Sequence, residues 1–307
     1  MVIKPVVVIA GATAVGKSSI GLKLAQELET EIINADSMQF YRGMDIGTAK
    51  LSIEERMGVH HHFIDILDVS ELANVSHYQE MARRVVSDLR EQNRVPIAVG
   101  GSGLYVTALL DNLNFPATDS QLRANLESEL EKVGSQQLHQ RLAVLDPLSA
   151  QRIDPANGRR IVRALEVIEL TGEPFSSSLP KSNPAVEPDI RIALFRDRAE
   201  LDRRIEQRVN LMWEQGFVAE VEKLLTDGLA EGVTARKALG YAQIIEALTG
   251  ELSLDAAKAE TIRLTKRYAR KQESWFRRDP KMLWLAADSP NLASEILQLI
   301  NESGVVR

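Results

Sequence analysis

The strongest constraint on the fold is an apolar run that leads directly into a glycine-rich loop. Residues 6–10 read Val-Val-Val-Ile-Ala, and the loop after them reads Gly11-Ala12-Thr13-Ala14-Val15-Gly16-Lys17-Ser18. The β-branched run is typical of a buried parallel strand, and the residues after the loop favour a helix. The spacing fits a P-loop, whose backbone N–H groups and lysine bind phosphate oxygens. We therefore predict a phosphate site here, strengthened by the helix dipole, with Ser18 holding Mg²⁺.

Composition limits where the chain acts and what it binds. The chain has 307 residues, a net charge of -6 and no cysteine. It is long enough for one large domain or two smaller ones, and it has neither disulfides nor thiolate metal sites, which fits the cytoplasm. No apolar stretch approaches membrane-spanning length, and the first apolar run is too short for a signal peptide. Because the net charge is negative, any RNA binding must come from a local basic surface.

A second predicted strand covers residues 31–37 and ends in a carboxylate. The carboxyl ends of parallel strands open onto one crevice, so we expect Asp36 to lie beside the phosphate loop. A carboxylate there can take a proton from a nucleophile or help to hold Mg²⁺. The alternative is that Asp36 only caps the following turn.

A third predicted strand covers residues 94–99 and ends in Gly100-Gly101. P-loop ATPases usually place a Mg²⁺-linked aspartate at this point, whereas two glycines permit close approach of a ligand or of backbone. Ser102 and Tyr105 follow and are candidates for the same crevice, although helix capping and packing would also explain them.

Three consecutive histidines, His60, His61 and His62, precede another predicted strand at 63–67. Neighbouring side chains on a strand point to opposite faces, so all three cannot converge on one ion. We therefore expect a structural role for them. An amphipathic helix is predicted from Val75 to about Glu91.

Between about residues 115 and 188 the sequence pattern is typical of helices, with little propensity for strands. Apolar residues such as Leu122 and Leu126 recur at helical spacing, and a linker-like stretch at 176–184 contains prolines and serines that disfavour a helix. Arg159, Arg160 and Arg163 follow one helical side. They form either a solvated charged face or a surface that grips phosphates.

The last part of the chain returns to an alternation of strands and helices, with strands predicted at 190–195 and 282–285 and an amphipathic helix at the end. Arg204 and Arg208 are four residues apart on a helix and share a face, so one or both can reach the phosphate site. A later helix carries a basic stripe, and its Leu264, Tyr268 and Trp275 are expected to pack in the core. The basic stripe comprises Arg263, Lys266, Arg267, Arg270 and Lys271.

These elements predict an α/β fold. Its P-loop core comprises 1–114 and 190–307, with a mostly parallel sheet flanked by helices, and 115–189 forms a helical insertion domain. Two enzyme classes fit the residues. In a small-molecule kinase, Lys17 and Ser18 hold ATP and Asp36 deprotonates an acceptor hydroxyl. In a group transferase, the loop holds a departing diphosphate instead.

Several blocks resemble the bacterial tRNA dimethylallyltransferases, also called tRNA isopentenyltransferases or IPP transferases. They are the phosphate loop, Asp36-Ser37-Met38-Gln39, the run Tyr-Arg-Gly-Met-Asp-Ile-Gly-Thr-Ala-Lys at 41–50, and Gly-Gly-Ser-Gly-Leu-Tyr at 100–105. Blocks at 159–167, 204–208, 238–241 and 267–275 follow in family order. The resemblance covers nearly the whole chain, and its second and third blocks are far more specific than the loop.

The resemblance implies transfer of a dimethylallyl group from dimethylallyl diphosphate to the exocyclic amine of the adenine 3′-adjacent to the anticodon in tRNA. Asp36 would be the general base, and Thr13, Lys17 and Ser18, with Mg²⁺, would stabilise the departing diphosphate. Arg208 matches the arginine that the family places at the diphosphate. The adenine must leave its stack before it reacts.

The resemblance also implies a set of contacts with the anticodon stem-loop of tRNA. It further implies a monomeric, cytoplasmic protein that does not bind a membrane. The tRNA-binding positions are Asp36, Ser37, Met38, Gln39, Ser102, Arg159, Arg160, Ile161, Val162, Arg163, Gly240 and Tyr241. Three alternatives stay open at this point: an adenylate isopentenyltransferase that modifies a free nucleotide, a P-loop small-molecule kinase, and an RNA-binding protein without catalytic activity.

Overall fold

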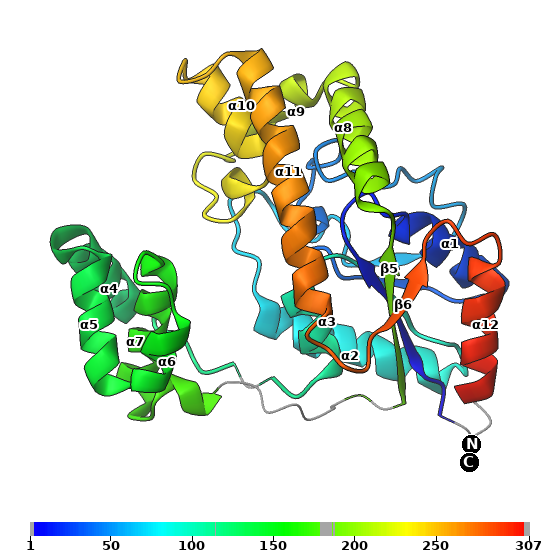
Figure 1. Ribbon diagram of the computed structural model, residues 1–307, viewed down its shortest axis with the longest axis horizontal. Helices are drawn as coiled ribbons and strands as arrows, with labels where there is room; N and C mark the ends of the chain where they lie inside the picture. The colour runs from blue at the N-terminus through cyan, green and yellow to red at the C-terminus, as the bar shows by residue number, and fades with distance from the viewer. Residues whose placement is uncertain (1–2, 114, 179–185, 187, 304–307) are drawn as a thin grey trace. The chain divides into compact units, whose positions relative to one another are not determined.

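A computed structural model describes residues 3–113, 115–178, 186 and 188–303, and it divides into two compact units (Figure 1). The first unit comprises Met1–Leu110 and Ala185–Arg307, and the second comprises Asp111–Pro184. The first unit is therefore built from two stretches of chain that the second unit separates in sequence.

The first unit is built around a six-stranded parallel sheet with the order β3-β2-β4-β1-β5-β6. Its strands are β1 (Val6–Gly11), β2 (Ile32–Asn34), β3 (His61–His62), β4 (Ile97–Val99), β5 (Asp189–Phe195) and β6 (Leu283–Ala286). β1 is buried at every residue and pairs with β4 on one side and β5 on the other. The predicted parallel sheet flanked by helices is confirmed, and the phosphate loop follows its central strand.

Helices cover both faces of the sheet. The helices of the first unit are α1 (Lys17–Glu27), α2 (Val75–Glu91), α3 (Gly103–Leu110), α8 (Arg198–Glu214), α9 (Phe217–Thr226), α10 (Tyr241–Leu248), α11 (Leu254–Phe276) and α12 (Leu292–Ser303). One apolar core lies under α1 and α12, and a second lies under α2 and α3. Within the described ranges, no helix is long and apolar enough to cross a membrane.

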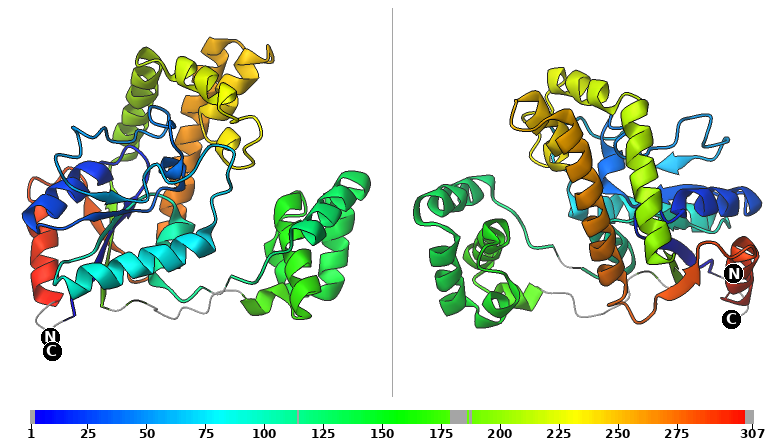
Figure 2. Two further views of the ribbon diagram at one scale, coloured as in Figure 1. Left: turned by 180° about the vertical axis from the view of Figure 1, so that it is seen from behind. Right: turned by 45° about the horizontal axis from the view of Figure 1, so that its top comes forward.

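A third core lies beyond the strand ends, where α8, α9 and α10 pack on the loop that follows β2. Phe217 of α9 and Tyr241 of α10 meet there edge to face at 4.8 Å and enclose Tyr41 and Met44 of that loop. α8 and α11 run side by side and extend past the sheet in both views of Figure 2. Short 3₁₀ helices at Ser37–Phe40 and Ala235–Lys237 complete this end of the unit.

The prediction of a strand at 63–67 is wrong. Only His61–His62 form β3, because Phe63 and Asp65 adopt left-handed backbone angles, with φ of 62° and 57°, that a strand cannot contain. The amide of Asn34 donates to the carbonyl of Phe63 at 2.9 Å and holds this turn against the end of β2. The chain therefore turns back toward Phe40 at this point instead of extending the sheet.

The second unit is a helical bundle with its own core. Its helices are α4 (Ser120–Val133), α5 (Ser135–Leu145), α6 (Pro147–Arg152) and α7 (Gly158–Thr171), followed by a 3₁₀ turn at Phe175–Ser178. Glu166 is buried in this bundle and pairs with Arg123 at 2.6 Å and Arg163 at 2.8 Å. The linker expected at 176–184 begins in the 3₁₀ turn, and its residues 179–184 lie outside the described residues.

Candidate active site

The loop between β1 and α1 has the backbone of a phosphate cradle. Gly16 caps α1 with a left-handed φ of 115°, no side chain caps the helix, and its first turn contains no acidic residue. The N-terminal amides of α1 and its positive dipole end are therefore available to an anion. Lys17 Nζ donates to the carbonyl of Ala12 at 2.8 Å, so the ammonium already lies over the loop.

Arginines from the C-terminal half of the unit hold this loop. Arg204 Nε donates to the carbonyl of Ala14 and Arg196 Nε to the carbonyl of Val15, each at 3.0 Å. Arg208 Nη1 donates to Thr13 Oγ1 at 3.4 Å. Of the two arginines that spacing placed on one face, Arg204 thus fixes loop backbone, whereas Arg208 turns its guanidinium into the site.

Asp36 lies where β2 ends and serves the fold as well as the site. Its carboxylate accepts from the backbone N–H of Met38 at 3.1 Å and so caps the 3₁₀ helix Ser37–Phe40. The backbone N–H of Asp36 in turn donates to Asn34 Oδ1 at 3.0 Å. Capping and placement in the crevice are therefore not alternatives, because the cap fixes the carboxylate in the crevice.

Burial and mutual charge shift the ionisation of this cluster. Burial raises the pKa of Asp36, and the nearby Lys17, the Met38 N–H and Arg208 oppose that shift. Burial also lowers the pKa of Lys17 to about 8, with Asp36 raising it and Arg208 lowering it further. The pKa of Arg208 is lowered by burial and by Arg204. An anion bound among these groups would restore the charge that burial disfavours on both cations.

Gly100 and Gly101 bring three strand ends into contact. A Cβ on Gly100 would lie 2.2 Å from the backbone of Ala35, and one on Gly101 would lie 2.3 Å from Gln272 Nε2. Gln272 of α11 is buried; its Nε2 donates to the carbonyl of Gly101 and its Oε1 accepts from the N–H of Thr13, both at 2.9 Å. The two glycines thus allow the backbone of neighbouring segments to approach closely. Close approach of backbone and close approach of a ligand are the two reasons for glycine that the sequence suggested here.

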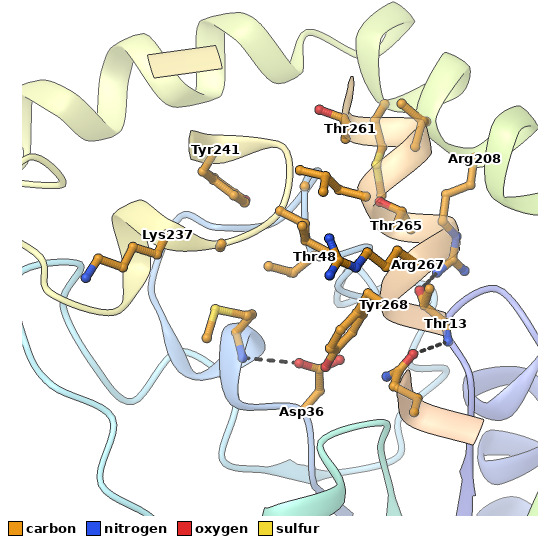
Figure 3. Close-up of a pocket in the computed structure, with 18 of the residues that line it drawn as sticks. Thr13, Asp36, Thr48, Arg208, Lys237, Tyr241, Thr261, Thr265, Arg267 and Tyr268 are labelled. Atoms are coloured by element: carbon orange, nitrogen blue, oxygen red, sulfur yellow. Dashed lines mark hydrogen bonds between the residues drawn. The ribbon is translucent and has the colours of Figure 1, made fainter. Parts of the chain in front are cut away.

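Two cavities meet at this cluster, and Figure 3 shows residues that line the larger one. A small crevice of about 60 Å³ is lined by Lys17, Ser18 and Gly100, and among its described lining residues Asp36 is the only carboxylate. A larger cavity of about 450 Å³ opens beside it, with Met212, Phe217 and Leu264 among its apolar walls. Their shared lining residues are Thr13, Asp36, Thr48 and Arg208. An anion cradle therefore adjoins an apolar chamber, with a carboxylate at the junction.

Helix α11 supplies one wall of the larger cavity. The sequence pattern did not predict that the large side chains of this helix would line a cavity. Leu264 and Tyr268 line the cavity, and Trp275 is 41% exposed, so the expectation that all three pack in the core is wrong. The core side of α11 consists of Ala257, Thr261, Ala269, Gln272 and Phe276. Mostly small or polar residues there let the helix lie close to the sheet.

The hydroxyl of Tyr268 joins the two sides of the site. It lies near the side chains of Ser102 and Gln272, and burial raises its pKa, as does the nearby Asp36. Ser102 Oγ also accepts from the backbone N–H of Ser37 at 3.2 Å. Ser102 therefore holds the start of the 3₁₀ helix that carries Ser37, Met38 and Gln39, and Met38 reaches the larger cavity.

The basic stripe of α11 divides into paired and unpaired cations. Arg263 pairs with Glu260 at 2.6 Å, and Lys266 pairs with Glu206 at 3.3 Å. Arg267 and Lys271 line the larger cavity and form no ion pair with any described residue, and the same holds for Lys237 across the cavity. These three cations form what we call the rim: Lys237, Arg267 and Lys271.

The remaining residues expected at tRNA belong partly to the second unit and partly to the first. In the second unit, Arg159 and Arg160 are exposed, whereas Ile161 and Val162 are in its core and Arg163 also donates to the carbonyl of Pro116 at 2.7 Å. That burial corrects the expectation for Ile161 and Val162, because side chains packed in a core cannot contact RNA. In the first unit, Gly240 is the N-cap of α10, and the buried Tyr241 lines the larger cavity.

Glu220 of α9 is a residue that sequence reasoning missed. Its carboxylate accepts from the backbone N–H groups of Asp45, Ile46 and Gly47 at 3.1, 2.7 and 3.3 Å, and from the hydroxyl of Tyr241 at 2.6 Å. It therefore holds the loop that carries Thr48 at the cavity junction. A glutamate on an amphipathic helix carries no sequence signal for such a role, because its partners are backbone groups far away in the chain.

Comparisons with known proteins agree along almost the entire chain. A family model described as IPP transferase matches residues 39–279. A tRNA dimethylallyltransferase of Thermobifida fusca is 55% identical over 302 residues, covering 97% of this chain and 94% of that protein. One of Streptomyces coelicolor is 55% identical over 298 residues, covering 96% of this chain and 95% of that protein.

Solved structures give the same result. The crystal structure of the full-length tRNA isopentenylpyrophosphate transferase from Bacillus halodurans matches with a TM-score of 0.72 and 38% identity, covering 98% of this chain and 97% of that one. A eukaryotic dimethylallyltransferase, caught in crystallographic snapshots acting on tRNA, matches with a TM-score of 0.83 and 25% identity, covering 97% of this chain and 79% of that one.

We predict that Glu220→Ala lowers the free energy of unfolding by about 1–3 kcal/mol, because it leaves several donors without their acceptor. Tyr241→Phe removes only one of the four bonds and should cost less. Urea unfolding followed by circular dichroism measures both. Glu222→Ala, an exposed glutamate on the same helix, is the control; equal losses in Glu220→Ala and Glu222→Ala would contradict the role of Glu220.

Proposed function

The chain belongs to the IPP transferase family, and from this premise we propose that it transfers a dimethylallyl group from dimethylallyl diphosphate to the exocyclic amine of the adenine 3′-adjacent to the anticodon in tRNA. The observation that carries the proposal is the placement of Asp36 at the junction of the anion crevice and the larger cavity. A donor with an anionic head and an apolar tail fits such a junction, with its reacting carbon beside the carboxylate.

The diphosphate binds at the loop Gly11–Ser18. The amides at the start of α1, the ammonium of Lys17 and the guanidinium of Arg208 face it, and Thr13 lies between them. As the bond between the allylic carbon and the diphosphate oxygen breaks, negative charge grows on the diphosphate. Cations held in a water-poor site stabilise that charge more in the transition state than in the bound donor.

The adenine amine supplies the electron pair for the new carbon–nitrogen bond, and its proton passes to the Asp36 carboxylate. The raised pKa of Asp36 makes it a stronger base than an exposed aspartate. The N–H of Met38 fixes one carboxylate oxygen. The products are the N-alkylated adenine, free diphosphate and a protonated carboxyl group, so atoms and charge balance.

Mg²⁺ belongs to this proposal as the partner of the diphosphate. Ser18 is exposed at the first turn of α1 and lines the same crevice as Lys17 and Asp36, so its hydroxyl fits a hard cation that also binds phosphate oxygens. Mg²⁺ supplies charge neutralisation to the departing diphosphate. The protein's own groups, Lys17, Arg208 and Asp36, bind the donor and accept the proton.

The rim favours tRNA over a free nucleotide as the acceptor. Lys237, Arg267 and Lys271 lie around the larger cavity, and no described carboxylate pairs with them, so they can bind backbone phosphates on either side of an inserted adenine. Arg159 and Arg160, exposed on α7, add two further phosphate contacts. A kinase fits less well, because β4 is followed by Gly100 and Gly101 where a Mg²⁺-linked carboxylate would stand.

We further propose that the protein works as a monomer in the cytoplasm. Every group assigned to the reaction comes from one chain, and the acceptor is tRNA.

The direct test is to incubate unmodified tRNA with dimethylallyl diphosphate, Mg²⁺ and the protein, and to analyse the nucleosides by mass spectrometry. We expect dimethylallyl-adenosine with wild type. Asp36→Asn, which retains the hydrogen bond to Met38 but is not a base, should lower kcat by about 100- to 10,000-fold with little change in tRNA affinity. Modification of free AMP but not of tRNA would contradict the proposal in favour of an adenylate isopentenyltransferase. Transfer of phosphate from ATP would contradict it in favour of a kinase.

The pKa shifts predict a bell-shaped pH profile of kcat/KM, which reports the free enzyme. The rate rises as Asp36 loses its proton, at a pH above the ordinary carboxyl range because its pKa is raised. The rate falls as Lys17 loses its proton near pH 8. Lys17→Arg should remove the alkaline limb, because a guanidinium stays charged there; an unchanged limb in that variant would exclude Lys17 as its source.

The rim predicts the salt dependence of tRNA binding. Arg267→Gln should weaken binding and reduce the slope of log Kd against log salt by about 1, the contribution of one phosphate contact. Arg263→Gln is the matched control, because Arg263 lies on the same helix but pairs with Glu260. Filter binding across a salt series measures both; identical slopes in the two variants would contradict the assignment of the rim.

A further inference from the structure

The three consecutive histidines have no part in the proposed reaction, and the structure separates them. His61 lines the anion crevice, whereas His60 and His62 point to the other face of the strand. The rings of His60 and His62 meet edge to face at 4.4 Å between centroids. Sequence reasoning excluded a site made of all three histidines, but it did not consider two of them with a residue from a neighbouring strand.

That third residue is Glu31, directly before β2. β2 and β3 are parallel with Ile32 opposite His61, so Glu31 lies on the same face as His60 and His62. Glu31 Oε2 is 2.7 Å from His62 Nε2. One ligand atom from each of the three residues lies within 4.8 Å of the other two. Two imidazoles and a carboxylate therefore converge at the sheet edge, since β3 is the outermost strand.

We propose that Glu31, His60 and His62 form a binding site for Zn²⁺ or a related transition-metal ion. Two imidazole nitrogens and one carboxylate oxygen are ligands that zinc accepts, with water in the fourth position. Metal–ligand bonds of about 2.0–2.2 Å in a tetrahedron place ligand atoms roughly 3.4 Å apart. Small side-chain rotations reach this spacing from the present separations, because His60 is exposed and Glu31 and His62 are half-buried.

Arg94 prepares the carboxylate for this role. Its Nη1 donates to Glu31 Oε1 at 2.9 Å, so one oxygen is fixed and the other faces the histidines. Metal-ligating carboxylates are commonly oriented by a hydrogen bond of this kind. The ion would link the start of β2 to an edge strand of only two residues, and Asp36 follows two residues after the end of β2 at Asn34. A bound ion would therefore stabilise the fold at this edge of the sheet. The site lies on the face of β3 opposite the anion crevice.

The test uses the full chain without a histidine tag, in excess Mg²⁺ so that sites for hard cations are filled. Zn²⁺ is titrated in competition with a chromogenic chelator, and Co²⁺ reports geometry through its visible absorption. We expect one ion per chain, a tetrahedral Co²⁺ spectrum and a higher melting temperature with Zn²⁺. His60→Ala should weaken binding by at least roughly 10- to 100-fold, the loss that even an outer partner of a metal site causes.

His61→Ala is the matched control, because it removes one histidine from the same run. It should leave the Zn²⁺ affinity within about twofold, since its side chain points to the other face. Glu31→Gln, which keeps the shape and the bond to Arg94, should weaken binding as His60→Ala does. An octahedral Co²⁺ spectrum, equal losses in His60→Ala and His61→Ala, or wild-type affinity in Glu31→Gln overturns the proposal.

Discussion

The close contact between strand ends is the constraint on which the candidate site depends. The backbone of Ala35 lies against Gly100, with the N–H of Ala35 donating to Val99 and its carbonyl accepting from Ser102. Gln272 then bridges Gly101 to Thr13. The carboxylate after β2 and the phosphate loop after β1 are thereby fixed to one another through backbone groups. A side chain at Gly100 would force the strands apart and separate Asp36 from the phosphate loop.

Opposed electrostatic effects make this cluster suited to an anionic ligand. Burial disfavours charge on Lys17, Arg208 and Asp36 alike, while attraction between the carboxylate and the cations partly restores it. A bound anion would add the negative charge that stabilises the two cations further.

The sequence predicted the elements whose signal is local. The phosphate loop, the strand before it, Asp36 at a strand end and the helix from Val75 to Glu91 follow from spacing and periodicity. Prediction from the sequence failed where contacts between residues far apart in the chain determine the structure. The turn at 63–67 depends on an amide from Asn34, and the place of Tyr268 in the cavity wall depends on how closely α11 approaches the sheet. Glu220 has partners that no sequence pattern links to it. The placement of Ile161 and Val162 also required the core of the second unit.

The arginine bonds to the phosphate loop have a consequence for how the chain is made. Arg196 and Arg204 lie 181 and 190 residues beyond the loop carbonyls that they hold, and β1 takes β5 as a neighbour across the same span. During synthesis the N-terminal loop leaves the ribosome long before these partners exist, whereas the helical unit between them has its own core and can fold first. The cradle is thus completed late, and a truncated chain that stops after the helical unit lacks the residues that give the loop its shape.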